Sequence, residues 1–379
     1  MKVQRLHLDL TDACNLACAY CYVQSDRGNR DYRSHMTVEE WLSVIRQAVA
    51  SGIRSFIVSG GEPLAFPGFV EILHQLEEHE ARVTILTNLW RVPNAVVAVV
   101  ENSSVVKEVV VSLDGFEGHD LGRPPSSWQD VAQAIKRLKG AGLARRVTVN
   151  TVLHKWNIDE MERLQRFVAE MRVDRWRVDI PLKPHRLDVM VDFRTAIEVA
   201  ARLITNRYRE ESLQATELVL FRVYKSQLEG TSLPAALALG NQDLHPCDYF
   251  LGTLAIKPDG ALALCSPLQL VFGNVRQAGL TRAIELAAQH KFFSFKVTDI
   301  TDCEGCKYLR LCGSGCRADA LRWTGSVRSA DPISCVTMPL VEQTILPVLS
   351  PGLRGVYEQM IVPSGKPPFY VKLFPLERR

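Results

Sequence analysis

The chain has 379 residues, 47% of them hydrophobic and 23% charged, which suits one large folded domain with a smaller one and excludes a disordered or collagen-like chain. With 45 lysines and arginines against 42 aspartates and glutamates, the formal net charge is +3, so we predict neither nucleic-acid binding nor a basic membrane-binding surface. No apolar run approaches the roughly 20 residues of a membrane helix, and the N-terminus lacks an export signal, so we expect a cytoplasmic protein without a membrane partner.

The first half of the chain alternates between strand and helix patterns. Thr37 and Glu40 form a capping box, and the following helix has the apolar stripe Trp41, Val44, Ile45 and Ala48. Strands are predicted at Lys2–Leu10, Arg54–Val58, Arg82–Leu86, Glu108–Leu113, Arg146–Leu153 and Arg175–Ile180. Strands that alternate with helices through short loops predict an α/β fold with a parallel sheet, either closed into a barrel or open and doubly wound.

The second half has a different character. Residues 189–235 are charged with helical periodicity, which predicts a bridging helical segment that includes Glu217–Leu228. Pro258-Asp259-Gly260 separates two short apolar runs and predicts a β-hairpin. The proline-rich tail after residue 343 contains a candidate strand at Phe369–Leu373.

Ten cysteines are the most informative residues of the sequence. In a chain of this size without an export signal, they indicate metal or redox chemistry rather than disulfides. Cys14, Cys18 and Cys21 follow the first strand at C-x3-C-x2-C spacing. Three thiolates on one loop can bind three irons of a [4Fe–4S] cluster and leave the fourth iron open. A zinc site completed by His7 or His35 is the alternative.

The remaining seven cysteines are Cys247, Cys265, Cys303, Cys306, Cys312, Cys316 and Cys335. The C-x2-C-x5-C-x3-C run from Cys303 to Cys316 is a specific ligand pattern. Its four thiolates could bind one zinc ion, but that alternative leaves the other three cysteines of this set unexplained.

The first cysteine loop, placed directly after the first strand of a βα series, resembles that of the radical S-adenosylmethionine (radical SAM) superfamily. Ser59-Gly60-Gly61-Glu62-Pro63, one βα unit later, resembles the Gly-Gly-Glu-Pro motif of that family. The resemblance implies a partial (β/α)6 barrel, similar to a TIM barrel, over about residues 1–185. It also implies a cluster whose fourth iron is chelated by SAM, and cleavage of SAM to methionine and a 5′-deoxyadenosyl radical.

The same resemblance implies a set of SAM contacts. Glu62 would bind the ammonium group of SAM, and Gly60 and Gly61 would let the backbone approach a ligand. Ser112 and Arg123 resemble the residues that hold the ribose and carboxylate of SAM in one branch of the family, and Tyr20 occupies the loop position that meets adenine. The ordinary alternatives are a strand-end hydroxyl for Ser112, a surface cation for Arg123 and a core side chain for Tyr20.

The second cysteine set resembles the SPASM domain, a loop-rich iron–sulfur domain that follows the barrel in a subset of the superfamily. This resemblance implies two auxiliary clusters and so three [4Fe–4S] clusters in all. The distal cluster would be held by Cys303, Cys306, Cys312 and Cys335, and the proximal cluster by Cys247, Cys265 and Cys316. The proximal set lacks a fourth cysteine, so its fourth iron is either open to substrate or bound by water or a side chain such as His245, Asp248 or Tyr249.

The predicted domain order is a barrel at 1–185, a helical bridge at 186–244, a SPASM domain at 245–342 and a tail at 343–379. Most SPASM relatives act on peptides or proteins, so the resemblance implies an oxidoreductase that matures a ribosomally made peptide through a crosslink, thioether or residue oxidation. An electron donor such as flavodoxin or ferredoxin is implied. Because only 13 residues precede Cys14, we expect a separate leader-binding protein if one is used.

Two other functions are also compatible with the sequence. The first is a radical SAM enzyme that acts on a small molecule or a porphyrin, as haem-pathway relatives do. The second belongs to another class, a non-catalytic iron–sulfur electron carrier or zinc-binding interaction module. A Gly-Gly-Glu-Pro motif and a three-cysteine site disfavour this second class, because an electron carrier needs no SAM pocket.

Overall fold

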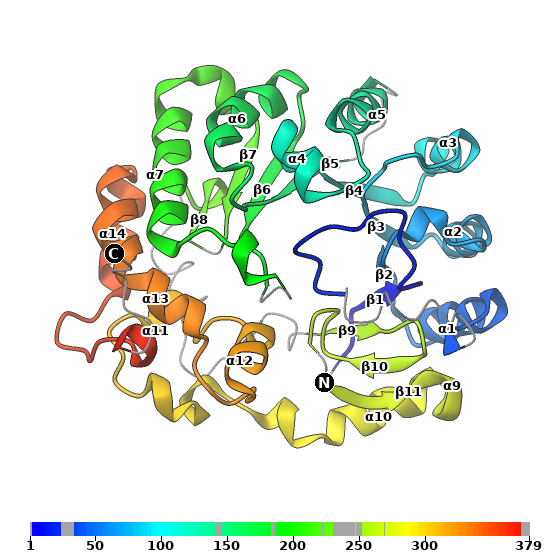
Figure 1. Ribbon diagram of the computed structural model, residues 1–379. Coiled ribbons are helices and arrows are strands. Elements are labelled where there is room, and N and C mark those ends of the chain that lie inside the picture. Colours follow the sequence, from blue (N-terminus) through cyan, green and yellow to red (C-terminus); the bar gives the residue numbers. More distant parts are fainter. Residues whose placement is uncertain are drawn as a thin grey trace. The chain divides into compact units, whose positions relative to one another are not determined.

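The computed structural model describes residues 2–23, 34–140, 146–182, 186–221, 223–229, 247, 252–268 and 270–372. The chain forms two compact units: unit 1 contains Met1–Asn150 and Asp248–Ser294, and unit 2 contains Thr151–Cys247 and Phe295–Arg379 (Figure 1). Each unit is assembled from two chain segments, and the domain boundaries expected from the sequence stay a prediction. Within the described residues, no helix combines the length and apolarity needed to cross a bilayer.

A mainly parallel sheet is the centre of unit 1. Its strands, in spatial order, are β11 (Val271–Asn274), β10 (Ala261–Ala263), β9 (Thr253–Ile256), β1 (Arg5–Asp9), β2 (Ser55–Ser59), β3 (Arg82–Thr87), β4 (Val106–Ser112) and β5 (Arg146–Val152), the last of which continues into unit 2. Neighbours from β9 through β1 to β5 are parallel, whereas β9, β10 and β11 are antiparallel. The parallel sheet and the hairpin around Gly260 are therefore confirmed.

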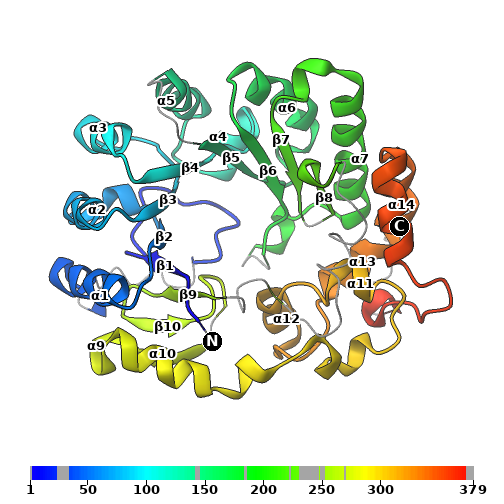
Figure 2. The same ribbon diagram turned by 180° about the vertical axis from the view of Figure 1, so that it is seen from behind.

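The helices that follow the parallel strands lie on one side of them (Figures 1 and 2). These helices are α1 (Val38–Ala50), α2 (Phe69–Glu78), α3 (Asn94–Asn102) and α5 (Trp128–Gly140); α4 (Glu117–Gly122), α9 (Val275–Ala278) and α10 (Leu280–Gln289) also belong to unit 1. The capping box is present, since the Glu40 amide donates to Thr37 Oγ1 at 3.2 Å and the Thr37 amide donates to Glu40 Oε2 at 2.8 Å. The predicted stripe from Trp41 to Ala48 is buried, as amphipathic packing requires.

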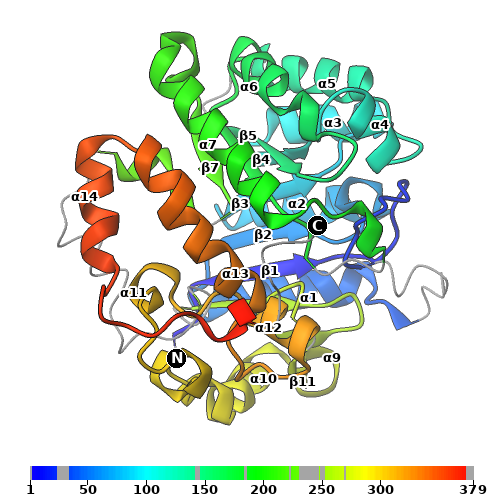
Figure 3. The same ribbon diagram turned by 60° about the vertical axis from the view of Figure 1, so that its left-hand side comes forward.

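Unit 2 combines a short sheet with a group of helices. Its strands β6 (Arg175–Asp179) and β7 (Glu217–Leu220) are parallel, and β8 (Tyr224–Lys225) is antiparallel to β7. Its α-helices are α6 (Met161–Glu170), α7 (Phe193–Arg209), α11 (Leu309–Cys312), α12 (Arg317–Thr324), α13 (Pro332–Leu340) and α14 (Pro351–Met360). Helix α13 packs against α7 and α12 and continues into a π-helical turn at Val341–Ile345 (Figure 3).

Two secondary-structure predictions were wrong. Glu217–Leu228 contains strands β7 and β8 rather than a helix. The segment forms a strand because it pairs with β6: Leu218 and Leu220 are buried in the sheet, and Glu217 forms an ion pair of 2.9 Å with Arg175. The candidate strand at Phe369–Leu373 is a 3-10 turn over Phe369–Lys372, and the two prolines that precede it cannot donate to a strand ladder.

A buried polar network joins β1 to β2 and to the turn after β10. Asp9 accepts hydrogen bonds from Ser59 at 2.6 Å and Ser266 at 2.8 Å, and its other oxygen lies 3.2 Å from Lys257 Nζ. His7 lies 2.5 Å from the Ser59 hydroxyl. Burial alone would raise the pKa of Asp9, but His7 and Lys257 together with the two hydroxyls outweigh it and lower the pKa. The carboxylate is therefore ionised and compensated.

Removing the cation from this network should destabilise unit 1. Lys257→Met leaves the buried Asp9 carboxylate without its ammonium partner, and we expect a loss of about 2 to 4 kcal/mol of folding free energy in urea unfolding. The double variant Asp9→Asn with Lys257→Met should lose less than Lys257→Met alone, because no buried carboxylate remains. Lys107→Met, at an exposed position of β4, is the matched control. Equal losses in the single and double variants would contradict this account.

Candidate cluster and cofactor sites

The loop that carries the first cysteines is held against the glycine loop after β2. The amide of Gly61 donates to the Thr11 carbonyl at 2.6 Å, and the amide of Glu62 donates to the Ala13 carbonyl at 2.8 Å. A Cβ atom on Gly60 or Gly61 would collide with these same carbonyl oxygens, and Gly60 also has a φ of +139°. The two glycines thus allow contact with the backbone that leads to Cys14, whereas the sequence had suggested an approach to a ligand.

Glu62 is the buried carboxylate of this loop, with an exposure of 0%. It accepts hydrogen bonds from the Leu64 amide at 3.0 Å, the Asn88 amide at 2.7 Å and the Thr87 hydroxyl at 2.7 Å. Burial raises the pKa of Glu62 to about 7, although these three donors act in the opposite direction. An ammonium group that approached this carboxylate would favour its ionised form.

The thiols of Cys14 and Cys18 receive hydrogen-bond donors from the surrounding protein. The Leu16 amide lies 3.4 Å and the Asn88 side-chain amide 3.6 Å from Cys14 Sγ. Arg123 Nη1 lies 3.9 Å from Cys18 Sγ. Donors of this kind stabilise thiolates, and hydrogen bonds to the ligating sulfurs help to set the reduction potential of a bound cluster. Cys21 lies on the same loop, where its amide donates to the Cys18 carbonyl at 3.3 Å.

Arg123 is buried and forms a two-pronged ion pair with Asp114. Its Nε lies 2.7 Å from Asp114 Oδ2 and its Nη2 lies 3.1 Å from Oδ1. The Tyr20 hydroxyl donates to the same carboxylate, and the Arg123 guanidinium lies 5.3 Å from the centre of the Tyr20 ring. Burial alone would lower the pKa of Arg123, but the interactions with Asp114, Tyr20 and Cys18 are stronger and raise that pKa above its ordinary value.

The segment around Arg123 also supports the backbone of the cysteine loop. The Ala17 amide donates to the Pro124 carbonyl at 2.7 Å, and the Ala19 amide donates to the Gly122 carbonyl at 3.0 Å. Ser112 ends β4, opposite Asn150 of β5. Asp114 was missed as a site residue by sequence reasoning, although the carboxylate two residues beyond Ser112 at the strand end was an available signal.

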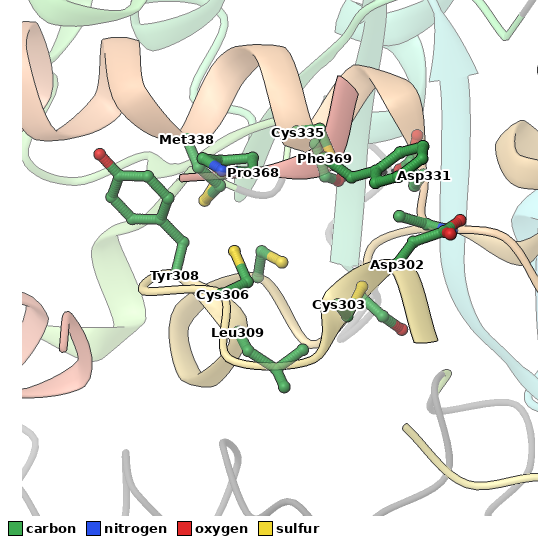
Figure 4. A pocket seen from close by; sticks show the side chains of 14 residues that line it. Asp302, Cys303, Cys306, Tyr308, Leu309, Asp331, Cys335, Met338, Pro368 and Phe369 are labelled. Carbon is green, nitrogen blue, oxygen red and sulfur yellow. Dashed lines mark hydrogen bonds between the residues drawn. The ribbon is translucent and has the colours of Figure 1, made fainter. Parts of the chain in front are cut away.

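Four of the second-set cysteines line one pocket of unit 2. Cys303, Cys306, Cys312 and Cys335 line this pocket together, and Cys316 is not among the lining residues. Cys303 and Cys306 project from one stretch of chain toward Cys335 on α13 (Figure 4). Within the described ranges, no three histidine, cysteine or acidic side chains are already gathered around a point for a single metal ion. The pocket brings together the four cysteines predicted for the distal cluster, whereas the zinc alternative had used Cys316 in place of Cys335.

Donors and an unpaired hydroxyl also make this pocket suited to an iron–sulfur cluster. Backbone amides donate to the thiols of Cys306, Cys312 and Cys335. Ser314, which lines the pocket at a φ of +68°, has a buried Oγ without a hydrogen-bond partner among the described residues. A buried hydroxyl of this kind calls for an acceptor, which a cluster sulfide would supply.

Burial sets the protonation of the pocket thiols. It is the main cause that raises the pKa of Cys303 to about 12 and that of Cys335 to about 11, and it raises the pKa values of Cys306 and Cys312 too. The thiols are therefore protonated at neutral pH, and any metal that they bind must displace protons.

The proximal set is divided between the two units. Cys265 lies in unit 1, after β10, whereas Cys247 and Cys316 belong to unit 2. The candidate fourth ligands His245, Asp248 and Tyr249 lie outside the described residues. All ten cysteines are free thiols, with no disulfide.

Comparison with known proteins gives a consistent result. A family model described as the radical SAM superfamily matches residues 8–168. GTP 3′,8-cyclase of Peptoclostridium acidaminophilum is 30% identical over 277 residues, which cover 70% of this chain and 80% of the cyclase. The AdoMet-dependent heme synthase of Oleidesulfovibrio alaskensis is 23% identical over 359 residues, covering 87% and 86%. Mycofactocin maturase MftC of Mycolicibacterium smegmatis is 26% identical over 341 residues, covering 86% and 81%.

Solved structures share the fold. Native anSMEcpe with bound AdoMet matches with a TM-score of 0.71 at 17% identity, over 94% of this chain and 99% of that one. Streptococcus suis SuiB bound to precursor peptide SuiA matches with a TM-score of 0.67 at 17% identity, over 87% and 75%. The α/β fold expected from the sequence, a partial barrel with a parallel sheet, is confirmed by these similarities.

The buried Glu62 should make the stability of the ligand-free protein depend on pH. The pKa of Glu62 is higher in the folded protein than the ordinary 4.5. The stability that Glu62 contributes to folding is therefore complete below about pH 4.5 and is lost as the pH rises through about 7. Relative to Glu62→Gln, the wild type should lose roughly 3 kcal/mol of stability between pH 4.5 and 8, measured by urea unfolding at several pH values.

Glu39→Gln, an exposed substitution on α1, is the control and should leave the pH profile of the wild type unchanged. A constant difference between wild type and Glu62→Gln across this range would show that Glu62 titrates normally.

Proposed function

This chain belongs to the radical SAM superfamily, and on that premise we propose that it oxidatively modifies a ribosomally made peptide, with a radical derived from SAM. It is an enzyme that uses SAM and a [4Fe–4S] cluster, as its family does. The observation that carries the proposal is the gathering, in unit 1, of the Cys14–Cys21 loop with Glu62, Asn88 and Arg123 after the carboxyl ends of β1 to β4. Active sites of βα barrels form at this end of the strands.

Each residue of this group has a role in the proposal. Cys14, Cys18 and Cys21 hold the cluster, which with SAM supplies the 5′-deoxyadenosyl radical. Glu62 binds the ammonium group of SAM and loses its proton when that cation arrives. The donors on Cys14 and Cys18 keep these ligands in the thiolate form.

The arginine and its neighbours orient the rest of SAM. Arg123, Tyr20 and Ser112 face the remaining parts of the cofactor in this proposal, with Asp114 fixing the first two in place. Gly60 and Gly61 keep the glycine loop close to the cluster loop. Water exclusion by this buried group would protect a radical from side reactions.

Auxiliary clusters complete the proposed machinery. Cys303, Cys306, Cys312 and Cys335 hold the distal cluster, and their common pocket supports this assignment. Cys247, Cys265 and Cys316 would hold the proximal cluster, for which the sequence offers no fourth cysteine. Clusters held there would accept an electron from the substrate or position it, and a flavodoxin or ferredoxin would supply the electron for SAM cleavage.

A peptide substrate is supported by some of the relatives. MftC and the sporulation killing factor maturation protein SkfB of Bacillus subtilis are named as maturation proteins, and SuiB was solved with its precursor peptide. The proposal includes either a separate leader-binding protein or none. It also includes a cytoplasmic location, because ten free cysteines suit a reducing compartment.

A porphyrin substrate is the second candidate. It is supported by the heme synthase of Oleidesulfovibrio alaskensis, whose similarity extends over 87% of this chain. The two candidates are separated by incubating the reduced enzyme and SAM with deuterated precursor peptides encoded near its gene or with deuterated porphyrin precursors. Deuterium recovered in 5′-deoxyadenosine identifies the substrate from which hydrogen is taken. Transfer from the porphyrin alone would overturn the peptide assignment.

SAM cleavage should depend on the first cysteine loop. Reconstituted wild type with dithionite and SAM should produce 5′-deoxyadenosine, measured by chromatography, whereas Cys14→Ala with Cys18→Ala and Cys21→Ala should produce none. The wild type should hold about twelve irons per chain and the triple variant about four fewer. Equal iron in both proteins would refute the assignment of these cysteines.

A further inference from the structure

Arg317 is the buried cation of unit 2 that the proposed function does not use. It begins α12, directly after Cys316, and only 1% of its surface is exposed. A guanidinium group remains charged in proteins, so burial at this level requires compensation by hydrogen bonds and nearby negative charge.

The hydrogen bonds of Arg317 go to neutral backbone carbonyls. Nη1 donates to the carbonyls of Val327 at 2.9 Å and Ser329 at 2.6 Å, and Nη2 donates to that of Ser314. Its Nε is buried and has no hydrogen-bond partner among the residues that the structure describes. A buried donor without an acceptor is costly and points to a group that binds there.

One carboxylate and three cysteines interact electrostatically with Arg317, and a cysteine carries negative charge only once it has lost its proton to bind a metal. Asp331 interacts with Arg317 electrostatically, but the oxygens of Asp331 also accept hydrogen bonds from the amides of Cys316 and Ile333, both at 2.9 Å. The other interacting groups are Cys303, Cys316 and Cys247. One of these cysteines belongs to the predicted distal set and two belong to the proximal set. The geometry agrees, because Arg317 directly follows Cys316 and its Nη2 donates to the carbonyl of Ser314, which lines the pocket of the distal set.

We infer that Arg317 is a positioning residue whose buried charge is shared by both auxiliary cysteine sets, and that it raises the reduction potentials of the clusters they hold. The inference rests on the proposed function, because it requires those clusters. Cluster potentials depend on nearby charge and on hydrogen bonds to sulfur. A fixed cation favours the reduced cluster, which carries one more negative charge, and the unpaired Nε–H supplies a donor for a cluster or cysteine sulfur.

A purely structural role is the competing explanation. The three carbonyl hydrogen bonds tie the turn at Ser314 to the segment from Val327 to Ser329, and this connection alone could justify burying the side chain. The electrostatic role and the structural role predict different effects of replacing Arg317 with lysine. The variant Arg317→Lys keeps the charge but loses the fork of donors, whereas Arg317→Met loses both.

The test uses the full chain with Cys14, Cys18 and Cys21 replaced by alanine, so that only auxiliary clusters are present. After anaerobic reconstitution, iron content and the potentials of the clusters are measured, the latter by redox titration followed by electron paramagnetic resonance. At a fixed potential, Arg317→Met should lower the reduced-to-oxidised ratio about tenfold, which is ~59 mV for a one-electron couple. Arg317→Lys should stay within about twofold of the parent protein.

Arg310→Met is the matched control, because Arg310 lies on α11 near Cys312 but is exposed. It should leave both potentials unchanged. If Arg317→Met holds too little iron to titrate, retention of iron by Arg317→Lys supports the role of charge, and an equal loss in both variants overturns it. Fully assembled clusters with unchanged potentials in Arg317→Met also overturn it. A parent protein that binds no auxiliary cluster refutes the proposed function instead.

Discussion

Close contact between two loop backbones is the constraint on which the site of unit 1 depends. The loop after β2 can lie against Thr11 and Ala13 because Gly60 and Gly61 have no side chains. This contact places Glu62 where it accepts hydrogen bonds from Thr87 and Asn88 at the end of β3. Asn88 in turn reaches the thiol of Cys14. One steric requirement thus links the ends of three strands to the first cysteine of the cluster loop.

Local patterns in the sequence predicted most helices and strands. The features that the sequence did not predict depend on contacts between distant residues. Apolar residues repeat at regular intervals along these helices and strands, because each buries one face, as α1 does through Trp41. The ligand spacing of the cysteines is also local. In contrast, β7 is defined by pairing with β6, and the role of Asp114 depends on how α4 brings Arg123 back to the end of β4. The backbone contact of Gly60 and Gly61 was missed for the same reason, since only the fold shows which carbonyls they meet.

Two buried arginines lie near cysteines but in different electrostatic settings. Arg123 is matched by the Asp114 carboxylate through two hydrogen bonds, so the pair adds little net charge near Cys18. Arg317 donates mainly to carbonyl groups, while the nearby Asp331 accepts hydrogen bonds from other donors. The positive charge of Arg317 is therefore less neutralised and acts more strongly on neighbouring sulfurs. The first arrangement orders a loop, and the second provides a positive environment for additional anionic ligands.

The parallel pairing of β1 with β9 has a consequence for the synthesis of the chain. Lys257, which follows β9, meets Asp9 of β1 across a sequence separation of 248 residues. At about 5 to 20 residues per second, a ribosome needs roughly 12 to 50 s to make that stretch. The first five strands are complete only after Val152, and from then until β9 emerges their β1 edge has no β9 to pair with. An uncovered strand edge is a site for association with other chains, so shielding this edge until the hairpin emerges would favour productive folding of unit 1.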